Sequence, residues 1–175
     1  MKTNIVKIIT RNAIVAAIYF SLTLVTGPFS FGMLQVRIAE FLVLLCFFNR
    51  DYILGISVGC FLVNLLGNVF TGETLGIIDA LIGTGATILS CLIVSYMKHL
   101  FVATLVPVII NGFAVGTELY FFLENKLNYF AYVGFVALGE FIAVSVIGYL
   151  IIKLLIKNQR FLELIDAKRN IPAQK

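Results

Sequence analysis

Long apolar stretches, separated by short breaks that are polar or contain Gly and Pro, occupy most of the chain. A helix needs about 20 residues to cross the hydrocarbon core of a bilayer, so stretches of this kind predict membrane-spanning helices. The second stretch is short, but six fit the pattern, and they cover Asn4–Val25, Leu34–Phe48, Tyr52–Phe70, Leu75–Met97, Phe101–Leu123 and Tyr129–Ile156. The pattern therefore predicts an all-α integral membrane protein with six transmembrane helices.

The composition excludes the other classes of protein. Apolar residues make up 61% of the 175 residues, charged residues only 13%, and the mean hydropathy is +1.04. The charged share is about half that of an ordinary soluble domain, so a solvated surface around a core cannot be built from it. Cys46, Cys60 and Cys91 lie in apolar runs without CxxC or Cys/His spacing. We interpret them as small buried hydrophobic residues rather than as metal ligands or disulfide partners.

Lysine and arginine are sorted by membrane side. Arg37 lies within a predicted span, and Lys126 is alone on one side of the membrane. The other side carries eleven basic residues, namely Lys2, Lys7, Arg11, Arg50, Lys98, Lys153, Lys157, Arg160, Lys168, Arg169 and Lys175. Basic residues in short loops mark the cytoplasmic side, so both termini are predicted to be cytoplasmic. The net charge of +4 thus reflects topology and not nucleic-acid binding. We expect a membrane domain over residues 1–157 and a polar cytoplasmic tail over 158–175, whose few apolar residues rest on the membrane surface or a partner.

Polar side chains recur inside five of the predicted helices, from mid-membrane outward. Each ionisable group within a bilayer costs about 2.5–3.5 kcal/mol and therefore needs a reason. The residues concerned are Gln35, Arg37, Glu40, Asn64, Asn68, Asp79, Asn111, Glu118 and Glu140. Spacings of three, four and seven residues place Arg37 with Glu40, Asn64 with Asn68, and Asn111 with Glu118 on common helical faces. The spacing favours one shared cavity. The alternative is that Arg37 and Glu40 neutralise each other and the asparagines join helices as packing contacts.

The charge balance distinguishes these two interpretations. Four carboxyl groups accompany one arginine, so three remain without a counter-charge. Either these carboxyl groups are neutral and donate hydrogen bonds, or a cationic or donor-rich ligand completes the site. We favour the second possibility. Carboxylate and amide oxygens accept hydrogen bonds, so they suit an amine or a guanine-like edge with adjacent ring N–H and amino groups, and they disfavour phosphates and carboxylates.

Small residues at helical spacing indicate close helix packing. Ala13-Ile-Val-Ala-Ala17 is a small-xxx-small pattern that lets another helix approach, either within the bundle or from a partner. For a partner, the docking surface would comprise Ala13, Ala16 and Ala17. The pairs Gly55/Gly59 and Gly112/Gly116 are expected to serve packing within the bundle.

Several motifs of chemistry are missing from the sequence. It has no GxxxxGK[ST] phosphate loop, no HExxH or His-rich metal motif, and no GxSxG nucleophile elbow. We therefore predict no enzymatic activity, no metal and no cofactor, and we expect any energy source for transport to lie in another chain.

Motifs spread over the chain resemble a known family. A small protein of six helices with an AxxxA first helix resembles the substrate-binding S components of energy-coupling-factor (ECF) transporters. Within that group the sequence resembles the QueT family of queuosine-precursor transporters, through Gln35-Val-Arg-Ile-Ala-Glu40, Gly59-Cys-Phe-Leu-Val-Asn64, Ile78-Asp79 with Gly83-Thr-Gly-Ala-Thr87, Asn111-Gly-Phe-Ala-Val-Gly-Thr-Glu-Leu119 and Gly139-Glu140.

The resemblance implies capture of a 7-deazaguanine, such as 7-aminomethyl-7-deazaguanine, from outside the cell. It also implies docking, through the Ala13/Ala17 face, on a coupling transmembrane subunit driven by two cytoplasmic ATPase subunits. Two alternatives remain at this point. The chain could be a stand-alone proton- or cation-coupled carrier of a small amine or nucleobase, or a structural assembly subunit whose polar groups only join helices.

Overall fold

The structure is a computed structural model that describes residues 2–30, 34–71, 76–123 and 127–169. Within these ranges all regular secondary structure is helical. The long elements are α1 (Lys2–Val25), α4 (Tyr52–Thr71), α5 (Gly76–Tyr96) and α6 (Leu100–Phe122). The last apolar stretch is one continuous helical run made of α7 (Tyr129–Glu140), the π-helix η2 (Phe141–Gly148) and α8 (Tyr149–Leu155). The short elements are α2 (Gly27–Ser30), the 3₁₀ helix η1 (Ile38–Leu44), α3 (Leu45–Phe48) and α9 (Gln159–Leu164).

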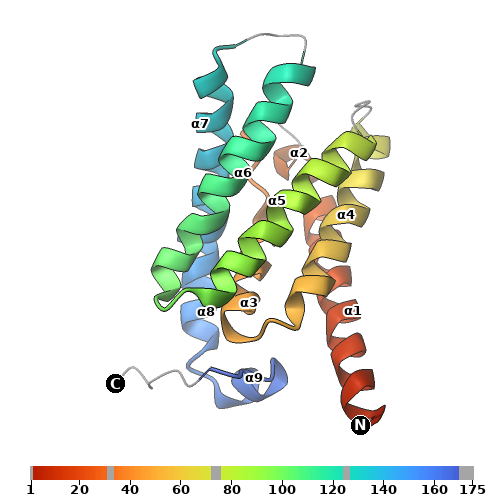
Figure 1. Ribbon diagram of the computed structural model, residues 1–175, viewed down its shortest axis with the longest axis vertical. Coiled ribbons are helices and arrows are strands. Elements are labelled where there is room, and N and C mark those ends of the chain that lie inside the picture. Colours follow the sequence, from red (N-terminus) through yellow and green to blue (C-terminus); the bar gives the residue numbers. More distant parts are fainter. Residues whose placement is uncertain (1, 31–33, 72–75, 124–126, 170–175) are drawn as a thin grey trace.

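The long helices form a bundle along one axis, and both termini lie at the same end of it (Figure 1). Neighbouring helices in the bundle are α1 with α4, α4 with α5, α5 with α6, and α6 with α7. Among the described residues, four helical runs are long and apolar enough to cross a membrane, namely Ile5–Val25, Gly76–Tyr96, Leu100–Phe122 and Tyr129–Leu155. Ile38–Phe48 and Tyr52–Leu66 are shorter apolar helices in the same part of the chain. A membrane protein with several spans is therefore shown, while six spans and two cytoplasmic termini remain predictions.

The second apolar stretch differs from the α-helix expected over Leu34–Phe48. Helical backbone begins only at Ile38 and is 3₁₀ up to Leu44. Gln35 has a φ of 39°, a left-handed conformation that ends any right-handed helix. The cause lies across the bundle: a Cβ on Gly139 would collide with the carbonyl oxygen of Leu34 and lie 2.7 Å from that of Gln35. The chain before η1 thus lies directly on the backbone of α7, where only glycine fits.

Glycines also bring α1 against α4 and α6 against α7, as expected from the sequence. A Cβ on Gly55 would lie 2.6 Å from the carbonyl oxygen of Asn12, and one on Gly59 would lie 2.9 Å from that of Ala16. A Cβ on Gly116 would lie 2.7 Å from Cα of Val133. These contacts confirm that both glycine pairs serve packing within the bundle.

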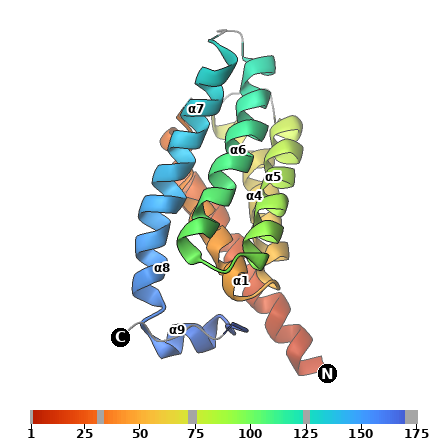
Figure 2. The same cartoon turned by 60° about the vertical axis from the view of Figure 1, so that its left-hand side comes forward.

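The segment after α8 turns back under the bundle, so that α9 crosses the end that carries the termini (Figure 2). Ile165 is buried, and Phe161 and Leu162 are half-buried against the main core. The Nδ2 group of Asn49 donates to the carbonyl oxygen of Asp166 at 3.0 Å, and the Tyr52 hydroxyl donates to that of Ile165 at 3.2 Å. Among Phe161, Leu162, Leu164 and Ile165, three therefore pack on this chain itself, and Leu164 stays exposed.

Candidate functional site

Glu40 lies on η1 at the centre of the bundle and is almost completely buried. One of its carboxylate oxygens, Oε1, accepts a hydrogen bond from the Tyr19 hydroxyl of α1 and a second from the Thr87 hydroxyl of α5 at 3.3 Å. The Thr87 hydroxyl also lies 3.4 Å from Sγ of Cys60 on α4. Side chains of α1 and α5 thus fix the position of this carboxyl group, and α4 contacts it through Thr87.

Arg37 precedes η1, with a backbone (φ −88°, ψ 87°) that is not helical, so a 3₁₀ turn joins Arg37 and Glu40 in place of the expected α-helix. The backbone N–H of Glu40 bonds to the carbonyl oxygen of Arg37 at 3.0 Å, which is the i to i+3 pattern of a 3₁₀ turn. The Arg37 side chain is buried. Its guanidinium charge acts on four carboxyl groups of the described residues, those of Glu40, Asp79, Glu118 and Glu140. Arg37 therefore joins these groups into one electrostatic cluster.

Glu140 is the last residue of α7, and its side chain belongs to this cluster. Its Oε1 atom accepts a hydrogen bond from Nδ2 of Asn111 on α6 at 3.0 Å. The helix changes to π geometry immediately after Glu140, and η2 packs against η1. A Cβ on Gly148 would lie only 2.5 Å from Cβ of Phe41, so the two irregular helices touch closely. Segments of π-helix are rare and often mark functional sites. Here η1 contains Glu40, and η2 begins directly after Glu140.

Asp79 and Asn64 approach each other from α5 and α4. Nδ2 of Asn64 donates to the backbone carbonyl oxygen of Asp79 at 3.3 Å and contacts Sγ of Cys60 at 3.5 Å. A Cβ on Gly83 would lie 2.5 Å from the same nitrogen. Gly83 thus provides the space in which the Asn64 side chain reaches α5.

Glu118 on α6 differs from the other carboxyl groups. It is buried, and among the described residues no donor reaches Oε1 or Oε2. Within the same part of the chain, Oε2 of Glu40, Oε2 of Glu140 and Oδ1 of Asn111 are also buried without a hydrogen-bond partner. All five atoms are oxygens that accept hydrogen bonds from donors. With the carboxyl groups ionised, the described cluster thus holds five buried acceptor atoms that a donor-rich ligand could reach.

The structure brings together seven of the nine polar residues selected from the sequence, and they comprise Arg37, Glu40, Asn64, Asp79, Asn111, Glu118 and Glu140. Gln35 is buried two residues before Arg37. Asn68 lies on α4, but its side chain is outside the described residues. Because Asp79 lies in the first turn of α5 and Glu118 in the last turns of α6, the cluster occupies the half of the bundle away from the termini.

None of Tyr19, Cys60 and Thr87 is selected as a site residue from the sequence: Cys60 is interpreted as a small buried residue, and Thr87 is included only in the Gly83–Thr87 motif. Tyrosine and threonine are common in membrane helices, so their presence alone carries little information. One signal was available: Tyr19 lies three residues after Ala16 in the close-packed face of α1, where an aromatic side chain has to point into the bundle.

The three alanines of α1 do not share one environment. Ala13 and Ala17 are exposed, whereas Ala16 is half-buried and its backbone faces Gly59 of α4. Ala16 therefore belongs at least in part to packing within the bundle. Ala13 and Ala17 leave a surface of small residues on the outside of the molecule.

Comparison with known proteins agrees with the family expected from the motifs. Residues 9–157 match the family described as QueT transporter. A relative is the queuosine precursor transporter QueT of Lactococcus lactis subsp. cremoris (strain MG1363), with 28% identity over 151 residues, which cover 81% of this chain and 88% of the relative. No solved structure matches the chain significantly. With a family match over most of its length and several helices able to cross a membrane, the chain is a multi-pass protein of the cell membrane and belongs to the QueT transporter family.

Proposed function

We propose that this chain is the substrate-capture subunit of an ATP-driven ECF-type importer and that it binds a queuosine precursor, a 7-deazaguanine such as 7-aminomethyl-7-deazaguanine. The site is the cluster around Arg37. Family membership supports transport, and the printed name of the Lactococcus lactis relative supports this substrate class. We include a coupling transmembrane subunit and two ATPase subunits because the sequence resembles the S components of ECF transporters.

One observation carries the choice of ligand. Among the described residues, buried acceptors without a donor gather in the cluster, and both carboxylate oxygens of Glu118 belong to them. An unsatisfied buried acceptor costs about 1–3 kcal/mol, so a ligand that supplies N–H donors recovers this free energy on binding. A deazaguanine supplies a ring N–H beside an amino group, and its aminomethyl form adds a cation. The same cluster repels an anionic ligand, because its four carboxyl groups outnumber Arg37.

Within this proposal the side chains have distinct roles. Glu118 or Glu140 accepts hydrogen bonds from the ring N–H and amino groups, and Asp79 or Glu40 faces the aminomethyl cation. Arg37 holds Glu40 in its ionised form. The remaining edge of the ligand contacts amide side chains, taken from Gln35, Asn64, Asn68 and Asn111.

The membrane topology belongs to the same proposal. Six spans with both termini in the cytoplasm would orient the cluster toward the outside, because it lies in the half of the bundle away from the termini. Residues 1–157 would then form the membrane domain, and 158–175 the cytoplasmic tail. The exposed Ala13 and Ala17 would form the surface that docks on the coupling subunit.

Binding of radiolabelled 7-aminomethyl-7-deazaguanine to the purified full chain tests the site. We expect saturable binding that is lost in the double variant Glu118→Gln, Glu140→Gln, because an amide supplies a weaker acceptor and no charge. Glu163→Gln is the matched control, since Glu163 is exposed on α9. Undiminished affinity in the double variant would refute the assignment.

Uptake into proteoliposomes tests the energy source. We expect no uptake by the chain alone and ATP-dependent uptake when the coupling and ATPase subunits are present. Uptake without them that a protonophore abolishes would instead identify a proton-coupled carrier. If the chain bound no small molecule and the Ala17→Leu variant failed to assemble with partner subunits, the chain would be a structural subunit.

A further inference from the structure

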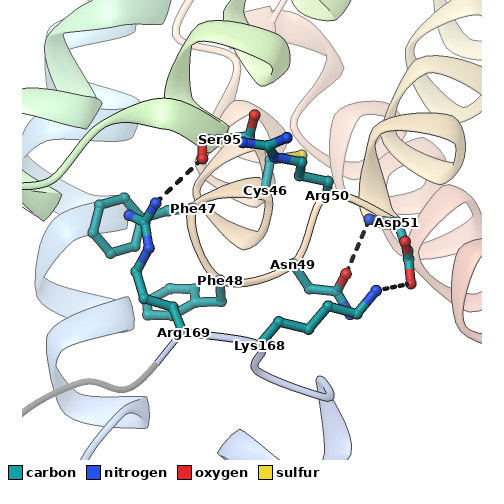
Figure 3. Close-up of a pocket in the computed structure, with 9 residues that line it drawn as sticks. All are labelled: Cys46, Phe47, Phe48, Asn49, Arg50, Asp51, Ser95, Lys168 and Arg169. Atoms are coloured by element: carbon teal, nitrogen blue, oxygen red, sulfur yellow. Dashed lines mark hydrogen bonds and ion pairs between the residues drawn. The ribbon is translucent and has the colours of Figure 1, made fainter.

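A second polar cavity lies at the opposite end of the bundle from the carboxyl cluster. It has a volume of about 310 Å³ and lies where the turn between α3 and α4 meets the end of α5 and the chain after α9 (Figure 3). Its lining residues are Cys46, Phe47, Phe48, Asn49, Arg50, Asp51, Ser95, Lys168 and Arg169. None of them belongs to the carboxyl cluster, so the cavity is a separate feature of the molecule.

The charge of this cavity is positive. Three of its lining residues are cationic and one is anionic. The Lys168 ammonium pairs with the Asp51 carboxylate at 2.6 Å, which neutralises both. No carboxylate among the described residues pairs with Arg50 or Arg169. Two guanidinium charges thus remain uncompensated beside one cavity.

Aromatic rings hold both guanidinium groups in place. The Arg50 group lies 4.0 Å from the centre of the Tyr96 ring, and the Arg169 group lies 4.4 Å from that of Phe47. Arg169 also donates to the backbone carbonyl oxygens of Met97 and Ser95. A guanidinium group stacked on a ring keeps its N–H groups in its own plane, where they can still donate. Their arrangement is therefore set before a ligand arrives.

Donors remain available on both groups. A guanidinium has five N–H donors, and Arg169 uses two of them. The Arg50 side chain makes no hydrogen bond to any described residue, and only the backbone carbonyl oxygen of Arg50 is bonded, to the N–H of Ile53. The planar fork of N–H groups on arginine matches the oxygens of a phosphate group in a bidentate manner. Tetrahedral oxyanions are thus the ligands that this set of donors fits best.

We propose that this cavity is a binding site for a phosphate group, with Arg50 and Arg169 as its principal ligands. The cavity lies where the helices α3 and α5 end, which is the level at which phospholipid headgroups meet a membrane protein. Basic pockets between spanning helices commonly bind anionic headgroups. The phosphate belongs either to such a headgroup or to free phosphate in solution.

Native mass spectrometry and calorimetry of the purified full chain test the proposal and separate the two sources. Phosphatidylglycerol is the lipid probe, phosphatidylcholine is the neutral comparison, and inorganic phosphate is the soluble probe. We expect one tightly retained phosphatidylglycerol and weak retention of phosphatidylcholine, whose choline cation offsets the phosphate. Binding of inorganic phosphate alone would assign the site to free phosphate, and binding of the lipid alone would assign it to a headgroup.

Arg50→Gln is the decisive variant, because the Arg50 side chain makes no hydrogen bond within the described residues and its backbone bond to Ile53 is kept in the variant. We expect its dissociation constant for the anion to rise at least about tenfold, as for the loss of one charge-assisted hydrogen bond. Arg169→Gln is the second variant, and Arg160→Gln on the exposed face of α9 is the control of equal charge. The proposal is overturned if neither probe binds, if Arg50→Gln binds as tightly as the wild type, or if Arg160→Gln weakens binding equally.

Discussion

Replacing Glu118 with methionine is predicted to stabilise the empty protein and to abolish ligand binding. Methionine has nearly the length of glutamate but no polar oxygen, so it fills the same space without a need for donors. Both oxygens of Glu118 are buried without a hydrogen-bond partner in the described part of the chain. In the empty protein this carboxyl group therefore costs free energy that the ligand alone recovers.

The magnitudes follow from general values for hydrogen bonds. Leaving a buried acceptor unsatisfied costs about 1–3 kcal/mol, and removal of the group recovers that amount. For a chain of this size, 1 kcal/mol corresponds to about 2–4 °C in melting temperature, so a rise of about 2–12 °C is expected. The ligand loses two hydrogen bonds to a carboxylate, worth about 1.5–3 kcal/mol each, which weakens binding by about 10²–10⁴-fold.

Thermal melting of the purified protein in detergent, with and without 7-aminomethyl-7-deazaguanine, measures both effects in one assay. Wild-type protein is expected to melt at a higher temperature with ligand, whereas Glu118→Met should melt higher without it and show no further shift. Glu163→Met is the control, because a substitution on an exposed surface changes stability by about 0.5 kcal/mol at most. A Glu118→Met protein that melts lower than the wild type, yet still responds to the ligand, would refute the reasoning.

Four further substitutions test other contacts. Tyr19→Phe removes a donor from Oε1 of Glu40 and leaves only Thr87 at 3.3 Å, so the empty protein should lose about 1–3 kcal/mol, measured as a lower melting temperature; an unchanged melting temperature would show that this bond does not stabilise the fold. Gly59→Ala should destabilise the protein by about 1–3 kcal/mol, because the new Cβ lies 2.9 Å from the carbonyl oxygen of Ala16. Gly85→Ala, which meets nothing within 4 Å, should instead stabilise it by about 0.5–1 kcal/mol, and the same sign for both alanines would contradict this explanation. Ala17→Leu should leave ligand binding intact and prevent co-purification with the coupling subunit. The control Val58→Leu, on the exposed face of α4, should leave both ligand binding and co-purification intact. Co-purification of the Ala17→Leu protein with the coupling subunit would exclude this docking surface.

The polar cluster could be predicted from the sequence because polar groups are costly inside apolar helices. Asp79, Asn111, Glu118 and Glu140 interrupt stretches that are otherwise almost wholly apolar, so their positions are visible without a structure. We expect these residues to converge because each helix turns its polar face toward the inside of the bundle. The lengths of the apolar stretches therefore predict the long helices, and the polar residues within them predict most members of the cluster.

The irregular backbone could not be predicted in the same way. The conformation of Gln35 and the 3₁₀ helix η1 depend on contact with Gly139, more than 100 residues later in the chain. The π geometry of η2 occurs within an unbroken apolar run, where nothing in the residue pattern marks it. A residue pattern indicates only the conformation that neighbouring residues prefer. The backbone geometry of η1 and η2 is instead determined by packing between the second and the last apolar stretch.

Comparison of two ligands on the wild-type protein tests most directly whether buried acceptors recognise a donor-rich ligand. 7-Deazaguanine and 7-deazahypoxanthine differ by one amino group, which donates hydrogen bonds from the ring edge. If Glu118 or Glu140 accepts from this edge, equilibrium binding should be at least about tenfold weaker for 7-deazahypoxanthine, and the difference should vanish in the Glu118→Gln, Glu140→Gln variant. Equal affinity of the wild-type protein for both ligands would contradict recognition by these carboxyl groups.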